Sequence, residues 1–268
     1  MKIGKQSRRA TAISTSNADM IVVRGKDLCR DLIGSVSLTE HFWLLVTGVL
    51  PTRAQAEVLD ACLVAIAEHG LVPSVQAARM TYAAGPEAMQ GAVAAGILGC
   101  GSVILGSAEN AGRLLARVIE RTAGNDTAAA AREIVQDLRA ALAAIPGYGH
   151  PQHKIADPRA ARLIAVADAA GLSGAHVGAA REVETAIREV VGKSLVLNVS
   201  GAIPAVLLDA GFPIGGLKGV PILARAASLV AHLVEEQARP IGFAISDGGA
   251  EVIDYDGAAP PDFVAGGH

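Results

Sequence analysis

Apolar residues recur at helical spacing through most of the chain. After Thr52, a residue type that caps helix starts, Val58, Leu59 and Cys62 fall on one face of a helix that runs until Gly70. The same pattern predicts further helices, over residues 38–46, 73–84, 86–99, 107–121, 126–144, from 158 onward, 178–191, 198–210 and 218–237. The chain is therefore expected to be helical almost throughout.

Two stretches near the chain ends combine β-forming residues with turn residues. Residues 11–24, TAISTSNADMIVVR, hold two β-prone runs joined by a polar Ser/Asn/Asp turn. Residues 241–254, IGFAISDGGAEVID, place Asp-Gly-Gly between two such runs, which favours a hairpin turn. We expect an all-α fold with minor β-hairpins near both termini.

Composition narrows the kind of helical protein. Of 268 residues, 51% are hydrophobic but only 3% aromatic, so Ala, Val, Leu and Ile on closely packed helices must form the core. The net charge is −3 and no basic block occurs, which argues against nucleic-acid binding. The mean hydropathy is +0.39, yet the longest apolar stretch, around 91–106, is shorter than the roughly 20 residues of a membrane helix. We expect no membrane span and an apolar oligomer interface instead.

The cysteines, the histidines and the first residues of the chain indicate the cellular compartment and whether a metal site is expected. Cys29, Cys62 and Cys100 are odd in number and lack Cys-x-x-Cys spacing, which predicts free thiols. His150 and His153 have no carboxylate or thiol nearby, so no metal site is expected. The start, MKIGKQSRR, has charges with no apolar segment behind it and is not expected to be a signal peptide. A cytoplasmic protein is expected.

One stretch, IPGYGHPQHKIADPR, concentrates cationic side chains on a bend rich in Gly and Pro. Gly147 and Gly149 bend the backbone just before His150 and let a ligand approach it closely. Lys154 adds a donor, and Asp-Pro predicts a helix start with Asp as N-cap and Arg159 in the first turn. A helix N-terminus beside an arginine suits a carboxylate or a phosphate. The alternative is that His150 is an ordinary surface or core imidazole.

Other polar residues interrupt apolar helices, and each has a structural explanation beside a functional one. His69 at a helix end can act as a cationic cap that interacts with the helix dipole. The Asn-Val-Ser of residues 198–200 can cap the helix that follows. Arg225 lies in an apolar helix, where an unpaired charge is costly, so it must find a carboxylate or a bound anion. His232 and Glu236, at i and i+4, are expected to pair on the helix face.

Three segments in this order resemble the citrate synthase superfamily, especially its citryl-CoA lyase branch. They are PGYGHPQHKIADPR, LNVSGAIPAVLLDAGF and ARAASLVAHLVEE, and the resemblance extends from about residue 11 to 254. It implies a mostly helical protein of two domains, a larger one of residues 1–107 with 213–268 and a smaller one of residues 108–212. The site would lie in the cleft between them, and domain closure would exclude water.

The resemblance also implies chemistry, because members of this family make or break the C–C bond between a CoA thioester and a polycarboxylate carbonyl compound. His150 matches the histidine that faces the carbonyl oxygen, and His69 matches a carboxylate-binding histidine. Arg159 and Arg225 match carboxylate-binding arginines. Arg239 resembles the arginine that reaches into the partner subunit's site, which implies a homodimer.

Coenzyme A is the cofactor that the resemblance implies, bound as an acyl-CoA substrate. In the family it lies along the Gly-rich turn and nearby basic residues. The matching positions here are Gly147, Gly149 and Lys154, with Lys193 as a weaker match.

The sequence departs from the family at two positions. Leu105 stands where citrate synthases carry an enolate-stabilising histidine, which speaks against a synthase more than against a lyase. Ser200 stands where the pattern Asn-Val-Asp-Gly has the catalytic aspartate. A serine has too high a pKa to take a proton at pH 7 without an activating base, and losing a general base typically costs about 10²–10⁴-fold in rate.

Three hypotheses follow for the function. The first is a citryl-CoA lyase-like enzyme in which another group, such as His150 or a substrate carboxylate, moves the proton. The second is other CoA-thioester chemistry, hydrolysis or acyl transfer, that uses Ser200 as nucleophile or hydrogen-bond donor. The third is a non-catalytic homologue that binds CoA or a tricarboxylate.

Overall fold

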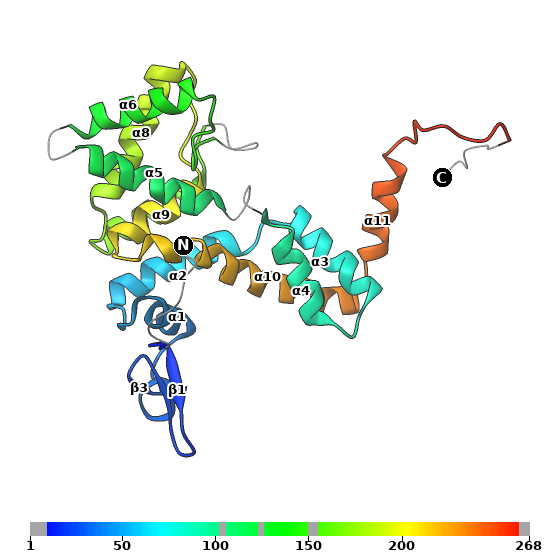
Figure 1. Cartoon of the computed structure of the whole chain (residues 1–268), viewed down its shortest axis with the longest axis horizontal. Helices are drawn as coiled ribbons and strands as arrows, with labels where there is room; N and C mark the ends of the chain where they lie inside the picture. Colours follow the sequence, from blue (N-terminus) through cyan, green and yellow to red (C-terminus); the bar gives the residue numbers. More distant parts are fainter. Residues whose placement is uncertain (1–9, 102–105, 123–125, 150–154, 263–268) are drawn as a thin grey trace. The chain divides into compact units, whose positions relative to one another are not determined.

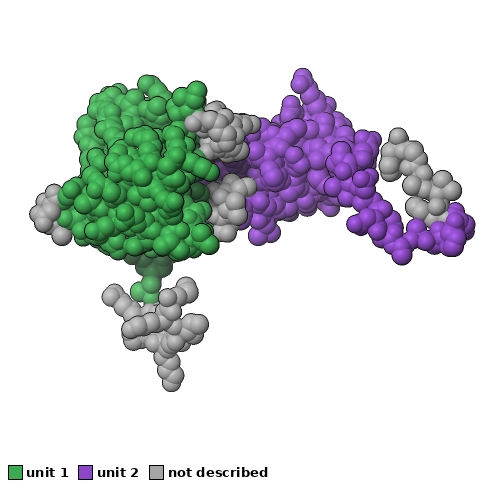
Figure 2. Space-filling view, turned by 90° about the horizontal axis from the view of Figure 1, so that it is seen from above, with its two compact units in different colours: residues 1–65, 106–220 green, residues 66–105, 221–268 purple. Residues whose placement is uncertain are grey.

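The structure, a computed structural model, describes residues 10–101, 106–122, 126–149 and 155–262. The chain divides into two compact units, residues 1–65 with 106–220 (unit 1) and residues 66–105 with 221–268 (unit 2; Figure 2). Two of the boundaries lie close to those of the predicted domains, 1–107 with 213–268 and 108–212. The break after Ala65 has no counterpart in that prediction, and the predicted domain division stays a prediction.

Unit 1 begins with a small antiparallel sheet. Strand β1 (Ser14–Ser16) pairs with β2 (Ile21–Val23), with Ser14 opposite Val23, and β2 pairs with β3 (Lys26–Asp27). The hairpin predicted over residues 11–24 is therefore confirmed. A single π-helical turn, η1 (Leu28–Leu32), follows the sheet and was not predicted.

The predicted helices of unit 1 are confirmed to within a few residues, as listed here: α1 (Leu38–Thr47), α2 (Arg53–Ala67, through Ala65), α5 (Gly106–Thr122), α6 (Thr127–Ala140), α7 (Pro158–Ala169), α8 (Ala175–Val191) and α9 (Val199–Asp209). A short 3₁₀ turn, η3 (Ile214–Gly216), follows α9 and was not predicted. Helix α9 is buried on nearly every side, and α5, α7 and α8 pack against it (Figure 1). Gly112 allows α5 to approach closely, because a Cβ there would lie 3.2 Å from Cβ of Pro204. The small side chains implied by composition thus bring these helices close together.

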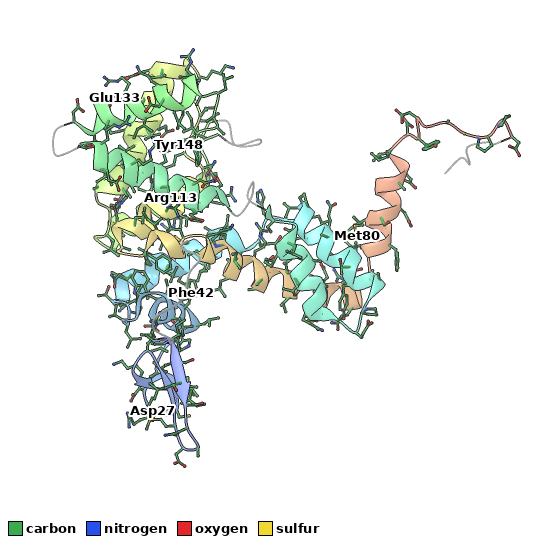
Figure 3. The ribbon with its side chains drawn as sticks, in the orientation of Figure 1. Asp27, Phe42, Met80, Arg113, Glu133 and Tyr148 are labelled. Atoms are coloured by element: carbon green, nitrogen blue, oxygen red, sulfur yellow. The ribbon has the colours of Figure 1, made fainter. Side chains whose placement is uncertain are left out.

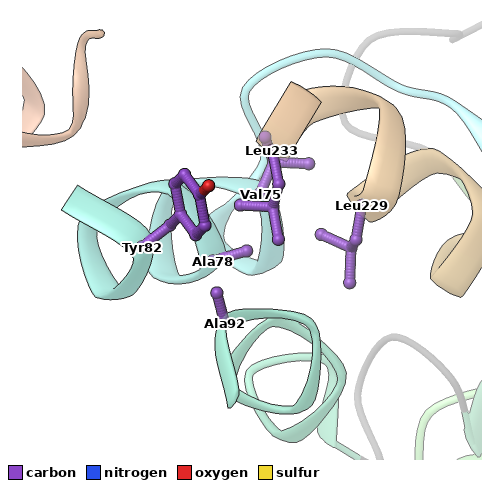
Figure 4. Packing of buried hydrophobic residues seen from close by; sticks show 6 residues of the cluster. All are labelled: Val75, Ala78, Tyr82, Ala92, Leu229 and Leu233. Atoms are coloured by element: carbon purple, nitrogen blue, oxygen red, sulfur yellow. The ribbon is translucent and has the colours of Figure 1, made fainter. Parts of the chain in front are cut away.

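Unit 2 contains α3 (Pro73–Ala84), α4 (Met89–Leu98), most of α10 (Gly219–Ala238) and α11 (Gly242–Glu251). Figure 4 shows its core, in which small and branched side chains of α3, α4 and α10 meet: Val75, Ala78, Tyr82, Ala92, Leu229 and Leu233. Gly96 of α4 faces Leu229, and a Cβ there would lie 2.7 Å from the Leu229 Cδ1 atom.

The hairpin predicted for residues 241–254 is wrong, because the chain forms α11 there. The start of this helix is fixed by Glu236, whose Oε1 accepts hydrogen bonds from the N–H groups of Ile241 (2.8 Å) and Gly242 (2.7 Å). The helix packs on α3, and a Cβ on Gly242 would lie 2.6 Å from Arg79 O. The capped start and this close packing outweigh the turn preference of Asp-Gly-Gly, which lies inside the helix.

One stretch, Ile214–Ala238, is long and apolar enough to cross a membrane by length and composition alone. Within unit 2, its Leu229 and Leu233 side chains are fully buried in the core. The same helix carries the buried charges of Arg225 and Glu236. Both features are typical of a core helix, which passes the same test of length and composition.

Replacing Leu233 tests the packing of unit 2. Leu233→Ala should lower the free energy of unfolding by about 2–5 kcal/mol, because it opens a cavity in a close-packed core. Gln237→Ala is the matched control, since Gln237 is exposed on the same helix, and it should change stability by about 0.5 kcal/mol or less. Urea denaturation measures both, and equal losses would contradict this core.

Candidate functional site

The Asp157 carboxylate joins the starts of two helices of unit 1. Its Oδ1 accepts hydrogen bonds from the Arg159 N–H and Nε, both at 3.0 Å. Its Oδ2 accepts from Arg159 Nη2 at 2.9 Å and from the Val199 N–H at 3.0 Å. The predicted N-cap of α7 is thus confirmed, and the same side chain also binds the first N–H of α9. Arg159 and the start of α9 are held together as a result.

The charge on Asp157 is stabilised where it lies. Its side chain is fully buried. Burial alone would raise the pKa of this carboxyl, but the hydrogen bonds and charge of Arg159 and the N–H of Val199 outweigh burial and hold the pKa below its usual range. Asp157 therefore stays ionised at neutral pH and keeps both helix starts in place.

Gly147 and Gly149 lie against the start of α9. Gly149 N–H donates to Val196 O at 2.8 Å, and Asn198 N–H donates to Gly147 O at 2.9 Å. The Asn198 side chain donates to Gly149 O at 2.7 Å and accepts from the Gly201 N–H at 3.2 Å. Asn198 is thus both the cap of α9 and the residue that fixes the Gly-rich bend.

At positions 147 and 201, only glycine permits this packing, because a Cβ would collide with the facing backbone. Gly147 has a φ of +86°, and a Cβ on it would lie 2.7 Å from Gly201 Cα. A Cβ on Gly201 would lie 2.6 Å from Gly147 O. The backbone of the bend and the first turn of α9 are therefore in direct contact.

Tyr148 anchors the bend from the other side. Its hydroxyl donates to Ala180 O of α8 at 2.8 Å, and its ring is buried among the helices of unit 1 (Figure 3). Burial, with a smaller contribution from the Glu184 carboxylate, raises the pKa of this phenol, so Tyr148 stays neutral. Its role is structural.

Ser200 is the second residue of α9 and is partly buried. Val199 before it gives its N–H to Asp157, and Gly201 after it gives its N–H to Asn198. Within the described part of the chain, no hydrogen bond engages the Ser200 N–H or hydroxyl. Both donors of Ser200 are thus available at a helix start, beside the Gly-rich bend.

Unit 1 therefore brings four predicted site residues to one place, which are Gly147, Gly149, Arg159 and Ser200. Arg159 also lines a largely apolar groove of about 470 Å³ between α2 and α7, together with Arg162. Lys193 is exposed just after the end of α8, and among the described residues no hydrogen bond or ion pair joins its side chain to this cluster. His150 and Lys154 lie outside the described residues.

The other three predicted residues belong to unit 2. Arg225 is only 5% exposed, and among the described residues no group accepts a hydrogen bond from its Nη1. His69 is exposed in the loop after α2, between Glu68 and Gly70. The Arg239 side chain is 82% exposed, and its nearest carboxylate is Glu235 at 4.0 Å.

The expected pairing of His232 with Glu236 is wrong, because both contact Arg79 of α3 instead. Arg79 Nε donates to Glu236 Oε2 at 2.6 Å, and Arg79 Nη1 lies 3.4 Å from His232 Nδ1. Arg79 is 2% exposed, and the sequence reading missed it. The rule applied to Arg225, that a charge on an apolar helix needs a partner, would have found it.

No cluster of three His, Cys, Asp or Glu side chains that could hold a metal ion occurs among the described residues. The hydrogen-bond donors found here suit an anionic organic ligand. They are arginines, helix-start N–H groups and a hydroxyl.

This fold is that of the citrate synthase class. The family described as "Citrate synthase, C-terminal domain" matches residues 24–242, so the chain belongs to it. Citryl-CoA lyase from Hydrogenobacter thermophilus is similar with a TM-score of 0.84 and 33% identity, over 96% of this chain and 97% of that one. ATP citrate lyase from Methanothrix soehngenii, solved with citrate and coenzyme A, shares the fold with a TM-score of 0.78 at 22% identity over 98% of this chain and 44% of that one.

Curated relatives are more distant. Citrate synthase from Haloferax volcanii is 28% identical over 204 residues, which are 75% of this chain and 52% of that protein. The chain thus spans about half the length of the curated relatives it matches.

Acid titration tests the role of Asp157. Because its pKa is lowered in the folded protein, its contribution to stability is present above the unfolded value near pH 4 and is lost as the pH falls through the folded value. Asp157→Asn should cost about 3–5 kcal/mol at pH 7 and should flatten part of the acid dependence of stability. Asp168→Asn on the same helix is the control, because that carboxylate is 51% exposed and 3.8 Å from Arg181. Denaturation from pH 7 to pH 2 measures both, and parallel acid profiles of Asp157→Asn and wild type would contradict the assignment.

A pair of glycine substitutions tests the contact between the bend and α9. Gly201→Ala should destabilise the protein and should broaden or shift the NMR signals of residues 147–149, because its Cβ collides with backbone. Gly178→Ala in α8 has open space around it and should stabilise the protein by about 0.5–1 kcal/mol. Thermal denaturation and amide spectra distinguish them, and a tolerated Gly201→Ala would exclude this packing.

Proposed function

We propose that the protein is a citryl-CoA lyase-like enzyme that cleaves the C–C bond of a CoA thioester of a hydroxy polycarboxylate into an acyl-CoA and an oxoacid. The observation that carries the proposal is the near-complete match to citryl-CoA lyase, over 96% of one chain and 97% of the other. The identity is also higher to this lyase, 33%, than to the citrate synthase from Haloferax volcanii, 28%.

Arg225 supports a polycarboxylate ligand. A guanidinium that is 95% buried with an open donor is costly unless an anion binds it. A carboxylate of the substrate would complete it with a charge-assisted hydrogen bond. Arg159, fixed by Asp157, and the exposed Arg239 and His69 are the other groups that the family resemblance assigns to substrate carboxylates.

The reaction requires two proton movements. When the C–C bond breaks, its electron pair goes to the acyl fragment as a thioester enolate, and the hydroxyl proton of the substrate leaves to a base as the carbonyl forms. The enolate carbon then takes up a proton to give the acyl-CoA. By resemblance, His150 faces the oxygen that loses its proton, and His150 or a substrate carboxylate delivers the proton to carbon.

The start of α9 is suited to the enolate rather than to proton abstraction. The N–H and hydroxyl of Ser200 are available donors, and the positive end of the helix dipole lies at the same place. Donors aimed at a developing oxyanion lower the barrier. We assign Ser200 to stabilising the thioester oxygen, and Gly147 and Gly149 to a close approach of CoA.

A homodimer forms part of the proposal. On the helices that flank Arg239, apolar side chains are exposed in the single chain, namely Val230 and Val234 of α10 and Phe243 of α11. A second copy that covers them would receive Arg239 at its site. Lys154 and Lys193 are proposed contacts of the CoA phosphates.

Arg225 provides the sharpest test of this function. Wild-type protein should release oxaloacetate from citryl-CoA, followed by NADH oxidation with malate dehydrogenase, and citrate should raise its melting temperature. Arg225→Gln should lose roughly 10²-fold in kcat/KM and the citrate shift, while the ligand-free protein is at least as stable as wild type, because an unpaired buried charge is removed. Arg53→Gln, whose side chain is 94% exposed, should behave as wild type.

Ser200 variants separate the alternatives. If wild type is inactive and Ser200→Asp is active, the lyase assignment fails for the natural protein. If Ser200→Ala abolishes turnover and mass spectrometry finds an acyl group on Ser200, the reaction is hydrolysis or acyl transfer. Calorimetric binding of CoA and citrate without turnover in any variant identifies a binding protein.

A further inference from the structure

In unit 2, a chain of polar contacts links the backbone next to His69 with the backbone of Arg239. Both are predicted site residues. It begins at Glu68, whose Oε1 accepts a hydrogen bond from the Gly70 N–H. The carboxylate therefore closes a short loop around His69. Its other oxygen, Oε2, accepts from Ser228 Oγ and lies 3.0 Å from His232 Nε2.

The chain continues through His232 to Arg79. Arg79 Nη1 lies 3.4 Å from His232 Nδ1 and can only donate, so Nδ1 accepts and the imidazole carries its hydrogen on Nε2. That hydrogen is then donated to Glu68. In this tautomer both ring nitrogens of His232 have a hydrogen-bond partner. The His232 side chain is 15% exposed and that of Glu68 is 52% exposed, so the bond to Arg79 is the more protected of the two.

Arg79 makes the last contact of this network, with Arg239. Its Nη2 donates to the backbone O of Arg239 at 3.2 Å, while Glu236 and Glu235 hold its Nε and Nη1 at 2.6 and 3.0 Å. The guanidinium is thus fixed by two carboxylates, and it fixes the residue at the end of α10. The exposed Arg239 side chain extends from a backbone that is held, although the side chain itself has only a weak ion pair at 4.0 Å.

We propose that Glu68, His232 and Arg79 are positioning residues that fix the backbone of His69 and Arg239 for carboxylate binding. This proposal rests on the proposed function, which assigns substrate carboxylates to His69 and Arg239. A loop residue and a helix-end residue would each lose conformational entropy on binding substrate. Because the network already orders the backbone of both residues in the folded protein, binding has less conformational entropy to lose.

Kinetics of citryl-CoA cleavage test the network. Glu68→Ala and His232→Leu should raise KM by up to about 10²-fold with a smaller change in kcat, because carboxylate binding is affected and not the bond-breaking step. His232→Gln should recover most of the loss, since its amide can donate to Glu68 and accept from Arg79, whereas His232→Leu keeps only the bulk. Glu57→Ala on α2 and Gln237→Ala on α10, both exposed, are matched controls and should equal wild type.

Amide hydrogen exchange makes the test independent of lyase activity. The Gly70 N–H should exchange at least tenfold faster in Glu68→Ala and His232→Leu than in wild type and in Gln237→Ala. Unchanged exchange at Gly70, or unchanged KM in an active enzyme, overturns the positioning role. If wild type does not cleave citryl-CoA, the proposed function fails, and the network is then judged by exchange at Gly70 and by the calorimetric affinity for citrate, which Glu68→Ala should lower.

Discussion

The Asp157 carboxylate is the group on which the candidate site of unit 1 depends. It binds three donors of Arg159 and the first N–H of α9, although 42 residues separate Asp157 from Val199. Helix starts leave N–H groups unsatisfied, and a buried ionised carboxylate requires donors. The free N–H at the start of α9 therefore donates to the buried Asp157 carboxylate, and Arg159 supplies the countercharge. The bend at Gly147–Gly149 then has a fixed surface to bind, because Asn198 lies at the same helix start.

The same arrangement recurs at two other places. Glu236 of α10 binds Arg79 and the first N–H groups of α11. Asp209 at the end of α9 binds the His176 imidazole and the N–H groups of Gly174, His176 and Val177 at the start of α8. In a chain with 3% aromatic residues, large interlocking side chains are few. Small side chains let helices approach, and buried carboxylates at helix ends fix which ends meet.

Sequence patterns predicted the features that neighbouring residues determine, and they missed contacts between residues far apart in the sequence. Helix limits and the Asp157–Pro158 start follow from periodicity and from capping within a few residues. The α11 helix was missed because its cap comes from Glu236, at the end of the preceding helix, while Asp-Gly-Gly favours a turn. The partner of His232 and Glu236 was missed because Arg79 is about 150 residues away in sequence. The contact of Gly147 with Gly201 is likewise long-range. The role assigned to Ser200 came from motif resemblance, since a serine at a helix start is by itself only a cap.

The polarity of the first turn of α9 bears on what Ser200 can do. Its neighbours' N–H groups are already bound to the Asp157 carboxylate and the Asn198 amide oxygen, which leaves the Ser200 N–H and hydroxyl as donors. A second carboxylate at position 200 would gain from the helix dipole but would lie one residue from the N–H that Asp157 binds, where like charges repel. Serine avoids this repulsion and keeps the turn electron-poor. In the proposed lyase, such a turn stabilises an enolate oxygen but accepts no proton, so both proton movements pass to the imidazole or to the substrate's own carboxylates.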